Sequence, residues 1–163
     1  MRHLEECVCS ITSQIYDNIS ILICDNGSTD GTWEYLSTIT DKRIVLKKLP
    51  NLYPNSYREA FDYAFENIDT EYVTFVGSDD LLDKNYITNC FKILNNGKNR
   101  ILCMQSGLSF INSDGLKVGH QIHQYKTLQD FKKQMLQRSV VNTPTVVYHK
   151  SLYPYLRTAA HDH

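Results

Sequence analysis

The sequence has 163 residues, enough for one domain with a hydrophobic core, and its 42% apolar and 21% charged residues are ordinary for a globular protein. A formal net charge of −1 excludes a general attraction to nucleic acid or to an anionic membrane surface. No apolar run reaches the roughly 20 residues of a membrane-spanning helix, and no secretory signal opens the chain.

Five cysteines, at positions 7, 9, 24, 90 and 103, show no Cys-x-x-Cys spacing, and three of them stand inside apolar runs. A free cysteine in such a run behaves as a small hydrophobic residue. Cys7 and Cys9 sit on a predicted helix, where alternate positions point to different faces, so they do not indicate a metal or redox site. We therefore expect reduced cysteines and a cytoplasmic protein.

The first hundred residues predict an alternation of helices and strands. Leu4, Val8, Ile11 and Ile15 recur at helical spacing. After this helix we expect strands at 19–24, 43–49 and 71–76, and helices at 29–38, 55–67 and 85–94, with Ser28 or Thr29 capping the helix at 29–38. Such an alternation is typical of βαβ units and a mostly parallel sheet.

The second half changes character. The apolar segment 100–111, the turn "NSDG" and residues 116–120 predict a hairpin. A helix at 127–138, a strand at 140–149 that contains Pro144, and a helix from Ser151 follow. We expect a single α/β domain over residues 1–163, with a small mixed or antiparallel elaboration at its C-terminal end.

Polar clusters follow two of the predicted strands: "CDNGSTD" after 19–24 and "GSDDLLD" after 71–76. Ligands of open parallel sheets bind outside the carboxyl ends of the strands. The alternation therefore predicts that Asp25, Asn26, Asp79 and Asp80 lie on one rim. Each cluster taken alone also fits a capped turn entering a helix, with Asp83 as the cap after the second strand.

The chemistry of these clusters favours a cation or a nucleoside. The spacing does not fit an EF-hand loop, and there is no GxxxxGK[ST] motif for phosphate. Adjacent Asp79 and Asp80 repel each other, and Mg²⁺ or Mn²⁺ would remove that repulsion while bridging the phosphates of a nucleotide diphosphate.

Two segments, "HLEECVCSITSQIYDNISILICDNGSTDGTWEYL" and "SYREAFDYAFENIDTEYVTFVGSDDLL", resemble a family 2 glycosyltransferase of the GT-A fold. The resemblance implies transfer of a sugar from a nucleotide-diphosphate donor, with UDP as the expected nucleotide, to a hydroxyl group of a saccharide or lipid-linked acceptor. It also implies an inverting, metal-dependent enzyme of polysaccharide or glycoconjugate synthesis. Residues 1–99 would form the nucleotide-sugar-binding half, and 100–163 a truncated acceptor-side half. The resemblance is also compatible with peripheral membrane association and with an oligomer.

The resemblance also implies roles for individual residues. Asp25 and Asn26 would face the base and ribose. Asp79 and Asp80 fall on the family's DXD-type element, where Asp79 would touch ribose and both would hold the metal ion. Arg58 would contact base or phosphate, although a solvent-exposed helix residue is an equal interpretation. Asp162 would be the general base, unless it belongs to a terminus without function.

The sequence departs from the family pattern at both ends. Family members begin with an apolar strand before the helix that starts here at Arg2, and they continue beyond the position of Asp162. We therefore expect a fragment or a shortened reading frame, and the alternative function is a non-catalytic nucleotide-sugar-binding remnant. A receiver or phosphatase domain is a third hypothesis, but the Lys that it requires after a late strand is not found.

Overall fold

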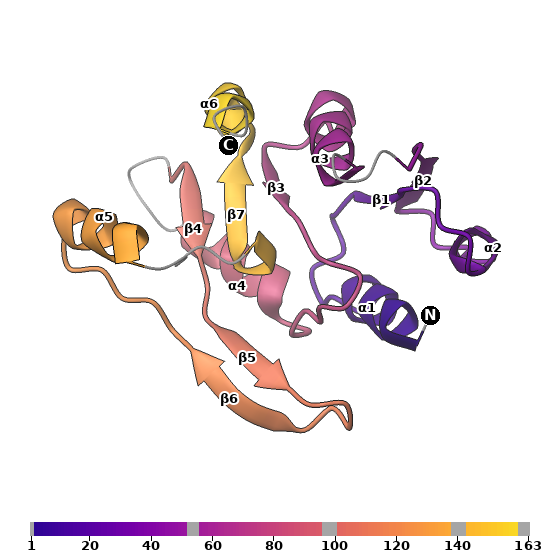
Figure 1. The fold of residues 1–163 in the computed structure, drawn as a ribbon, viewed down its shortest axis with the longest axis horizontal. Coiled ribbons are helices and arrows are strands. Elements are labelled where there is room, and N and C mark those ends of the chain that lie inside the picture. The colour runs from indigo at the N-terminus through magenta and orange to yellow at the C-terminus, as the bar shows by residue number, and fades with distance from the viewer. Residues whose placement is uncertain (1, 52–55, 96–100, 138–142, 160–163) are drawn as a thin grey trace.

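The computed structural model describes residues 2–51, 56–95, 101–137 and 143–159 (Figure 1). The first half contains α1 (Arg2–Thr12), β1 (Ile21–Asp25), α2 (Thr32–Ser37), β2 (Ile44–Lys48), α3 (Ser56–Asn67), β3 (Tyr72–Thr74) and α4 (Tyr86–Asn95). The second half contains β4 (Cys103–Gln105), β5 (Leu108–Ile111), β6 (Lys117–Gln121), α5 (Leu128–Gln137), β7 (Val146–His149) and α6 (Tyr153–Ala159). This order confirms the predicted succession of elements, except that the segment predicted as the first arm of the hairpin contains two strands, β4 and β5, in different sheets.

Three local predictions are wrong. Helix α1 ends at Thr12, so Ile15 is not part of its apolar stripe and is 61% exposed. Helix α2 begins only at Thr32, after Gly31 in the left-handed conformation, and neither Ser28 nor Thr29 caps it. Pro144 stands in a 3₁₀ turn (Thr143–Thr145) before β7 rather than inside the strand, because proline cannot donate a ladder hydrogen bond.

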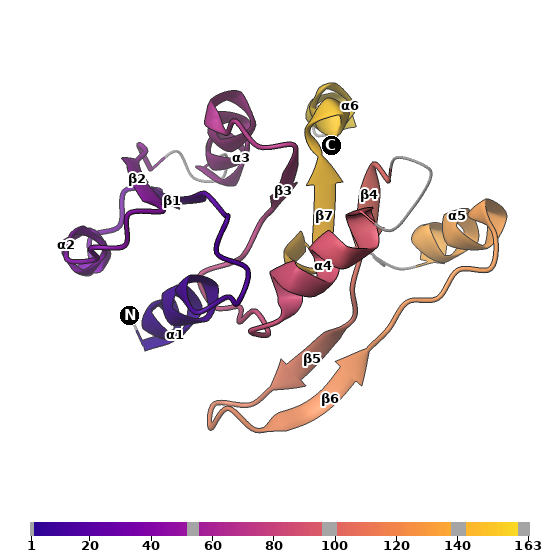
Figure 2. The same cartoon turned by 180° about the vertical axis from the view of Figure 1, so that it is seen from behind.

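The strands form three groups. β1 pairs in parallel with β2, while β7 lies between β3 and β4 and pairs with both in the antiparallel sense (Figures 1 and 2). Helix α4 crosses one face of the β3–β7–β4 group. β5 and β6 form the predicted hairpin, with a register shift at Phe110–Ile111. The fold is α/β, as expected, and in the described ranges the parallel pairing is that of β1 with β2.

The hydrophobic core joins α2 and α3 to the strands. Leu36 of α2 and Val146 of β7 are the most completely buried large side chains. Helix α3 contributes an apolar stripe to this core, in which Ala64 and Phe65 are buried. The Phe61 and Phe65 rings contact Phe75, with ring centroids 4.4 and 5.5 Å away, so the aromatic stripe of α3 packs on the segment that follows β3.

An apolar cleft lies between β1 and β3, which do not pair with each other in the described structure. We call it the inter-strand cleft; its volume is about 950 Å³. It is lined by residues 19–24, by residues 70–77, and by apolar side chains of α1, α3 and α4, among them Val8, Ile11, Ala60, Ala64, Ile87 and Phe91.

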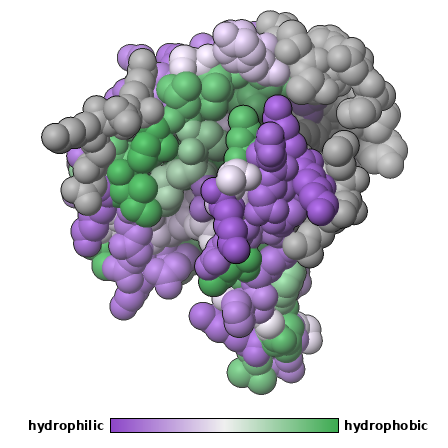
Figure 3. All heavy atoms as spheres, turned by 90° about the vertical axis from the view of Figure 1, so that its left-hand side faces the viewer, coloured by the Kyte–Doolittle hydropathy of each residue, from purple (hydrophilic) through white to green (hydrophobic). Residues whose placement is uncertain are grey.

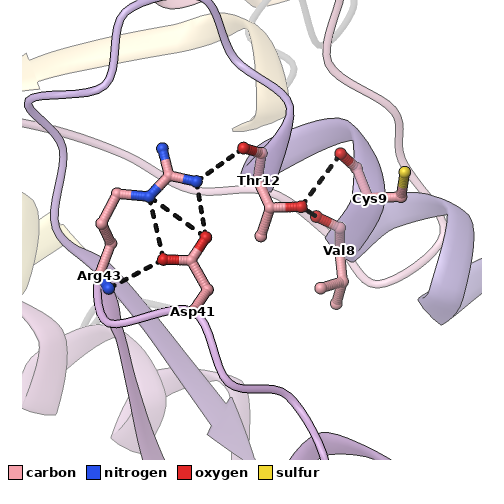
Figure 4. Close-up of polar contacts among 5 residues, drawn as sticks. All are labelled: Val8, Cys9, Thr12, Asp41 and Arg43. Carbon is pink, nitrogen blue, oxygen red and sulfur yellow. Dashed lines mark hydrogen bonds and ion pairs between the residues drawn. The ribbon is translucent and has the colours of Figure 1, made fainter.

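Arg43, before β2, connects the end of α1 to the β1–β2 pair (Figure 4). Its guanidinium donates to the carbonyl of Thr12 at 2.6 Å and to the Asp41 carboxylate at 2.6 Å. The hydrogen bonds from the Arg43 side chain and backbone to the Asp41 carboxylate lower the pKa of Asp41 to about 2. The contact fixes the C-terminal end of α1 against the turn that precedes β2.

The β5–β6 hairpin projects from the body of the molecule, as the space-filling view shows at its lower end (Figure 3). Several of its large apolar side chains are exposed, including Phe110 at 49%, Leu116 at 64% and Val118 at 65%. The core therefore does not extend into the hairpin.

Candidate functional site

A polar hollow of about 410 Å³ lies where the loops after β1 and β3 meet the start of α1. We call it the polar hollow; it is lined by His3, Leu4, Ser28, Asp30, Thr32, Ser78 and Asp79. Both polar clusters recognised in the sequence contribute to it. Of the four residues predicted to share a rim, Asp79 lines this hollow, whereas Asp25, Asn26 and Asp80 are not among its lining residues. The loop after β1 contributes Ser28 and Asp30, which the prediction did not name.

The loop after β1 is fixed by the buried side chain of Asp25, which is only 4% exposed. Its Oδ1 accepts a hydrogen bond from the backbone N–H of Ser28 at 3.1 Å. Its Oδ2 and the Oδ1 of Asn26 are buried and have no hydrogen-bond partner in the described part of the chain. A buried acceptor left unsatisfied costs about 1–3 kcal/mol. These two oxygens are therefore suited to accept hydrogen bonds from a ligand.

Glycine is required in this loop at two points. Gly27 has φ +76°, and a Cβ there would lie 3.0 Å from the backbone nitrogen of Asn51. Gly31 has φ +87° and precedes α2. Between them, Asp30 accepts from the backbone N–H of Thr32 at 3.2 Å and from its hydroxyl at 2.7 Å, which lowers the pKa of Asp30. The Asp30 carboxylate is therefore anionic at neutral pH at the rim of the polar hollow.

The loop after β3 gathers two carboxylates around Gly77. A Cβ at Gly77 would lie 2.8 Å from Oδ2 of Asp80 and 3.0 Å from Oδ1 of Asp79. Both carboxylates thus reach the same point, which only a residue without a side chain leaves open. The carbonyl of Gly77 accepts from the backbone N–H of Asp80 at 3.1 Å and from the Cys7 thiol at 3.3 Å, so the loop is anchored to α1.

The electrostatics of this loop are unfavourable in the absence of a counter-charge. Burial, and then the neighbouring charge of Asp79, raise the pKa of Asp80. Burial, and then the charges of Asp80 and Asp79, raise the pKa of the Cys7 thiol to about 11. A cation between the two carboxylates would lower the energy of both charged groups. The pair therefore fits a hard divalent cation bound by oxygen ligands.

The Asp79 and Asp80 carboxylates would supply only part of the coordination sphere of a metal ion. Among the described residues, no group of three or more His, Cys, Asp or Glu side chains converges as a metal site would require. A cation at Asp79 and Asp80 would take its other ligands from water and a phosphate group, an arrangement that Mg²⁺ adopts with nucleotides.

Helix α1 positions the second loop through its "SITSQ" motif, Ser10 to Gln14. The hydroxyl of Ser10 accepts from the backbone N–H of Leu82 at 3.1 Å. The buried amide of Gln14 donates to the carbonyl of Asp83 at 2.8 Å and accepts from the N–H of Ile87 at 3.0 Å. These side chains hold the segment that follows Asp80, so the motif has a structural role next to the site.

Two predicted site residues are not joined to the polar hollow. Arg58, half-buried on α3, forms an ion pair with Asp62 one turn later, at 3.5 Å, and is not among the residues that line the hollow. Asp162 lies outside the described residues, so its role as a base stays a prediction. Conversely, sequence reasoning missed His3, which lines the hollow from the first turn of α1. No spacing signal marks it, because a lone His at a helix start has no pattern.

Comparison with known proteins identifies the family. A family profile described as "Glycosyl transferase family 2" matches residues 2–160. The chain belongs to glycosyl transferase family 2. The "CDNGSTDG" and "GSDD" segments and the helix motif before them all fall within the matched range.

Two curated relatives are similar over different shares of the chain. An Escherichia coli protein named UDP-Glc:alpha-D-GlcNAc-diphosphoundecaprenol beta-1,3-glucosyltransferase WfaP is 39% identical over 80 residues, which is 49% of this chain and 31% of WfaP. Glycosyltransferase GlyG of Streptococcus pneumoniae is 29% identical over 132 residues, which is 80% of this chain and 41% of GlyG. The chain thus spans less than half the length of these relatives.

A solved structure shares the fold. The structure of S. aureus TarS 1-349 aligns with a TM-score of 0.62 at 17% identity, covering 95% of this chain and 45% of that one. The likeness confirms the GT-A-type α/β fold expected from the sequence. No helix in the described ranges has the length and apolar character needed to cross a bilayer.

Proposed function

We propose that this chain is the donor-binding part of a glycosyltransferase that takes a sugar from a UDP-sugar with the help of Mn²⁺ or Mg²⁺. The observation that carries the proposal is the convergence of the Asp79 and Asp80 carboxylates around Gly77, beside a polar hollow that the "CDNGSTDG" loop shares. Membership of the family supports glycosyl transfer as the reaction class.

Asp79 and Asp80 would hold the cation, and the donor's diphosphate would complete its coordination. When bound, such a cation neutralises charge that develops on the departing diphosphate. The residues of this chain bind and orient: the Gly77 position leaves room for the ion, and α1 fixes the loop through the Cys7 thiol and Ser10.

The loop after β1 would recognise the nucleoside. Asp25 Oδ2 and Asn26 Oδ1 are buried acceptors without partners in the described structure. The N–H of a pyrimidine base and the hydroxyls of ribose are donors that would satisfy them. Because leaving such acceptors unpaired is unfavourable, they would favour a ligand that presents donors at this position.

The reaction would be a displacement with inversion. An acceptor hydroxyl oxygen attacks the anomeric carbon, the bond from that carbon to the diphosphate oxygen breaks, and UDP leaves. Asp162 would take the hydroxyl proton. WfaP is named for a UDP-glucose donor and a diphosphoundecaprenol-linked acceptor. This name supports the proposal of a UDP-sugar donor and a lipid-linked saccharide acceptor in polysaccharide or glycoconjugate synthesis.

A thermal-shift experiment on the 163-residue chain tests the donor site. UDP should raise the unfolding temperature only when Mn²⁺ is present, and Asp80→Ala should abolish this gain. Asp114→Ala, which removes an exposed carboxylate in the hairpin turn, is the matched control and should keep it. A shift that does not depend on the cation, or no shift with any nucleoside diphosphate, would contradict the proposal.

An activity measurement separates the main proposal from its alternative. Incubation of the chain with UDP-sugars, Mn²⁺ and a lipid-linked saccharide should release UDP in proportion to transferred sugar. UDP binding that requires Mn²⁺ without any release from a UDP-sugar would instead identify a nucleotide-sugar-binding remnant.

A further inference from the structure

The β5–β6 hairpin and the segment that follows it leave large apolar side chains in contact with water. Residues 108–133 expose those of Phe110, Ile111, Leu116, Val118, Ile122 and Leu128. In the described ranges β5 and β6 pair only with each other. A two-stranded hairpin alone is marginally stable in water, so contact of these side chains with an apolar environment would stabilise it. Exposed apolar clusters of this kind mark contact surfaces.

The end of the hairpin shows how these side chains come to be uncovered. Phe110 pairs with Gly119 across the hairpin, and a Cβ at Gly119 would lie 3.5 Å from Cδ2 of Phe110. Glycine places no side chain there, so the partner strand does not cover this part of the Phe110 ring. Ile111 and Leu116 stand on either side of the turn at 112–115. The hairpin therefore presents apolar side chains at its projecting end.

The same segment carries a local excess of positive charge. Its charged residues are two aspartates, Asp114 and Asp130, and four exposed lysines, Lys117, Lys126, Lys132 and Lys133. The Asp130 carboxylate accepts hydrogen bonds from the backbone N–H of Lys126 and from the Gln134 amide, both at 3.3 Å. Within the described ranges none of the four lysines forms an ion pair. The whole chain has 17 basic and 18 acidic residues, so its net charge conceals this local excess.

The hairpin, the segment after it and α5 form one outer side of the molecule. They run along its lower left in Figure 1 and along its lower right in the view from behind (Figure 2). The space-filling view of this side shows hydrophilic and hydrophobic residues next to each other on the hairpin (Figure 3). In both ribbon views the loop after β3 lies at the same lower end of the molecule. Basic and apolar groups are thus available together to one extended surface.

The combination of lysines with apolar side chains restricts what can bind here. A two-fold interface between copies of this chain places the same patch face to face, so it would bring lysines against lysines. Nucleic acid would match the lysines through its phosphates but would leave the apolar side chains in water. An anionic lipid surface supplies both partners, because its headgroups attract lysines and its acyl boundary takes up apolar side chains.

We propose that the β5–β6 hairpin docks on the surface of an anionic membrane. Phe110, Leu116 and Val118 enter the boundary between headgroups and acyl chains, while Lys117 and Lys126 remain at the level of the headgroups. The lysines of α5 add attraction to the negative surface. The docked chain holds the loop after β3 at the membrane-facing end. The inference rests on the hairpin and not on the donor site, so a failure to bind UDP would leave it unaffected.

Sedimentation with lipid vesicles measures this docking on the 163-residue chain. The probes are vesicles of equal parts phosphatidylglycerol and phosphatidylcholine, and vesicles of phosphatidylcholine alone. At about 0.1 M salt the partition coefficient should be about tenfold or more higher with phosphatidylglycerol. At about 1 M salt, where the screening length falls from about 10 Å to about 3 Å, this difference should largely disappear. Equal partition into the two kinds of vesicle at low salt, or no partition, would overturn the proposal.

The apolar contribution is tested by combining Leu116→Asp with Val118→Asp. This variant should lower partition into phosphatidylglycerol vesicles about tenfold or more, with an almost unchanged unfolding temperature, because both side chains are exposed. Val45→Asp is the matched control, since Val45 is also an exposed strand residue, at 56%, but belongs to β2. An equal effect of the two variants would overturn the assignment to the hairpin.

The basic contribution is tested independently by combining Lys117→Glu with Lys126→Glu. This variant should abolish the preference for phosphatidylglycerol. Lys42→Glu combined with Lys84→Glu, which changes two exposed lysines outside the segment, should keep the preference. A preference that survives in the first variant, or is lost equally in both, would overturn docking through the lysines of the hairpin.

Amide hydrogen exchange locates the contact on the chain. With phosphatidylglycerol vesicles, exchange should slow about tenfold or more in residues 108–122 and stay unchanged in α2. Slowing confined to other parts of the chain would overturn the proposal. Self-association without lipid that the Leu116 and Val118 substitutions abolish would assign the hairpin to a second copy of the chain, and this result would also overturn membrane docking.

Discussion

The loops after β1 and β3 are both acidic, but they hold their carboxylates in different ways. The side chain of Asp25 is buried. Its Oδ1 accepts a hydrogen bond from the Ser28 N–H, and its Oδ2 has no hydrogen-bond partner in the described part of the chain. Asp79 and Asp80 instead crowd around Gly77, and burial together with the Asp79 charge raises the pKa of Asp80. The loop after β1 therefore offers buried hydrogen-bond acceptors. The loop after β3 holds two carboxylates that repel each other, and a cation would relieve this repulsion.

This difference separates two kinds of recognition. A buried acceptor discriminates by hydrogen bonding, because a ligand without the donor leaves it unsatisfied. A pair of crowded carboxylates discriminates by charge, because a divalent cation stabilises both. Substitutions in the loop after β3 should therefore change the cation dependence of ligand binding, and substitutions in the loop after β1 should change the preference for the nucleoside.

The largest expected effect belongs to Gly77→Ala. The new Cβ would displace the ends of the Asp79 and Asp80 side chains, which can move into solvent at little cost in stability. We expect UDP affinity in Mn²⁺ to fall about 10–100-fold with an almost unchanged unfolding temperature. Titration calorimetry measures the affinity. Gly119→Ala, where a Cβ meets only Phe110 at 3.5 Å, is the control. Equal UDP affinities in the two variants would contradict the assignment of cation binding to the loop after β3.

A smaller effect is expected for Asp25→Asn. The amide oxygen can still accept from Ser28, but the second position becomes a donor. The loss of one accepted hydrogen bond corresponds to about 1–2 kcal/mol, or about tenfold in UDP affinity. Mn²⁺ dependence should remain, because Asp79 and Asp80 are untouched. Calorimetry with and without Mn²⁺ measures the UDP affinity and its dependence on the cation. A loss of cation dependence in this variant would contradict the assignment of nucleoside binding to one loop and cation binding to the other.

The next effect concerns stability and pH. The pKa of Asp80 is raised on folding, so the folded chain binds the Asp80 proton more tightly than the unfolded chain does. The contribution of Asp80 to the free energy of unfolding therefore falls as the pH rises from the ordinary carboxyl pKa of about 4 toward neutrality. Without Mn²⁺, Asp80→Asn should therefore stabilise the chain at pH 7 by less than about 1 kcal/mol, given solvent screening. Urea denaturation at pH 7 and pH 4 measures this, and the advantage should vanish at pH 4.

The smallest effect is expected for Asp41→Asn, and its sign is opposite. Arg43 holds the pKa of Asp41 at about 2, so this carboxylate stabilises the folded chain above the ordinary carboxyl pKa, and the gain is lost as the pH falls toward 2. The variant should be slightly less stable at pH 7 and equal to wild type at low pH. Denaturation curves that show the same pH trend for the Asp41 and Asp80 variants would contradict this assignment of charge.

Much of the fold could be predicted from the sequence because its signals are local. The spacing of apolar residues predicted α3 and α4, and the aliphatic run Ile21, Leu22 and Ile23 predicted β1. The turn "NSDG" located the hairpin: Asn112 accepts from two following backbone N–H groups, and Gly115 has φ +76°. Helix ends were less accurate, because the cap of α2 depends on Gly31 and on the hydrogen bonds of Asp30 rather than on residue type alone.

By itself the sequence determined the class of fold, the family pattern and the presence of carboxylates after two strands, since each follows from residue type and spacing along the chain. Only the tertiary structure decided that the Asp79 and Asp80 carboxylates approach each other around Gly77, that His3 lines the polar hollow together with Asp79, and that an apolar cleft lies between β1 and β3. These features depend on contacts between residues far apart in the chain, where packing and burial set the geometry, and no local pattern records them.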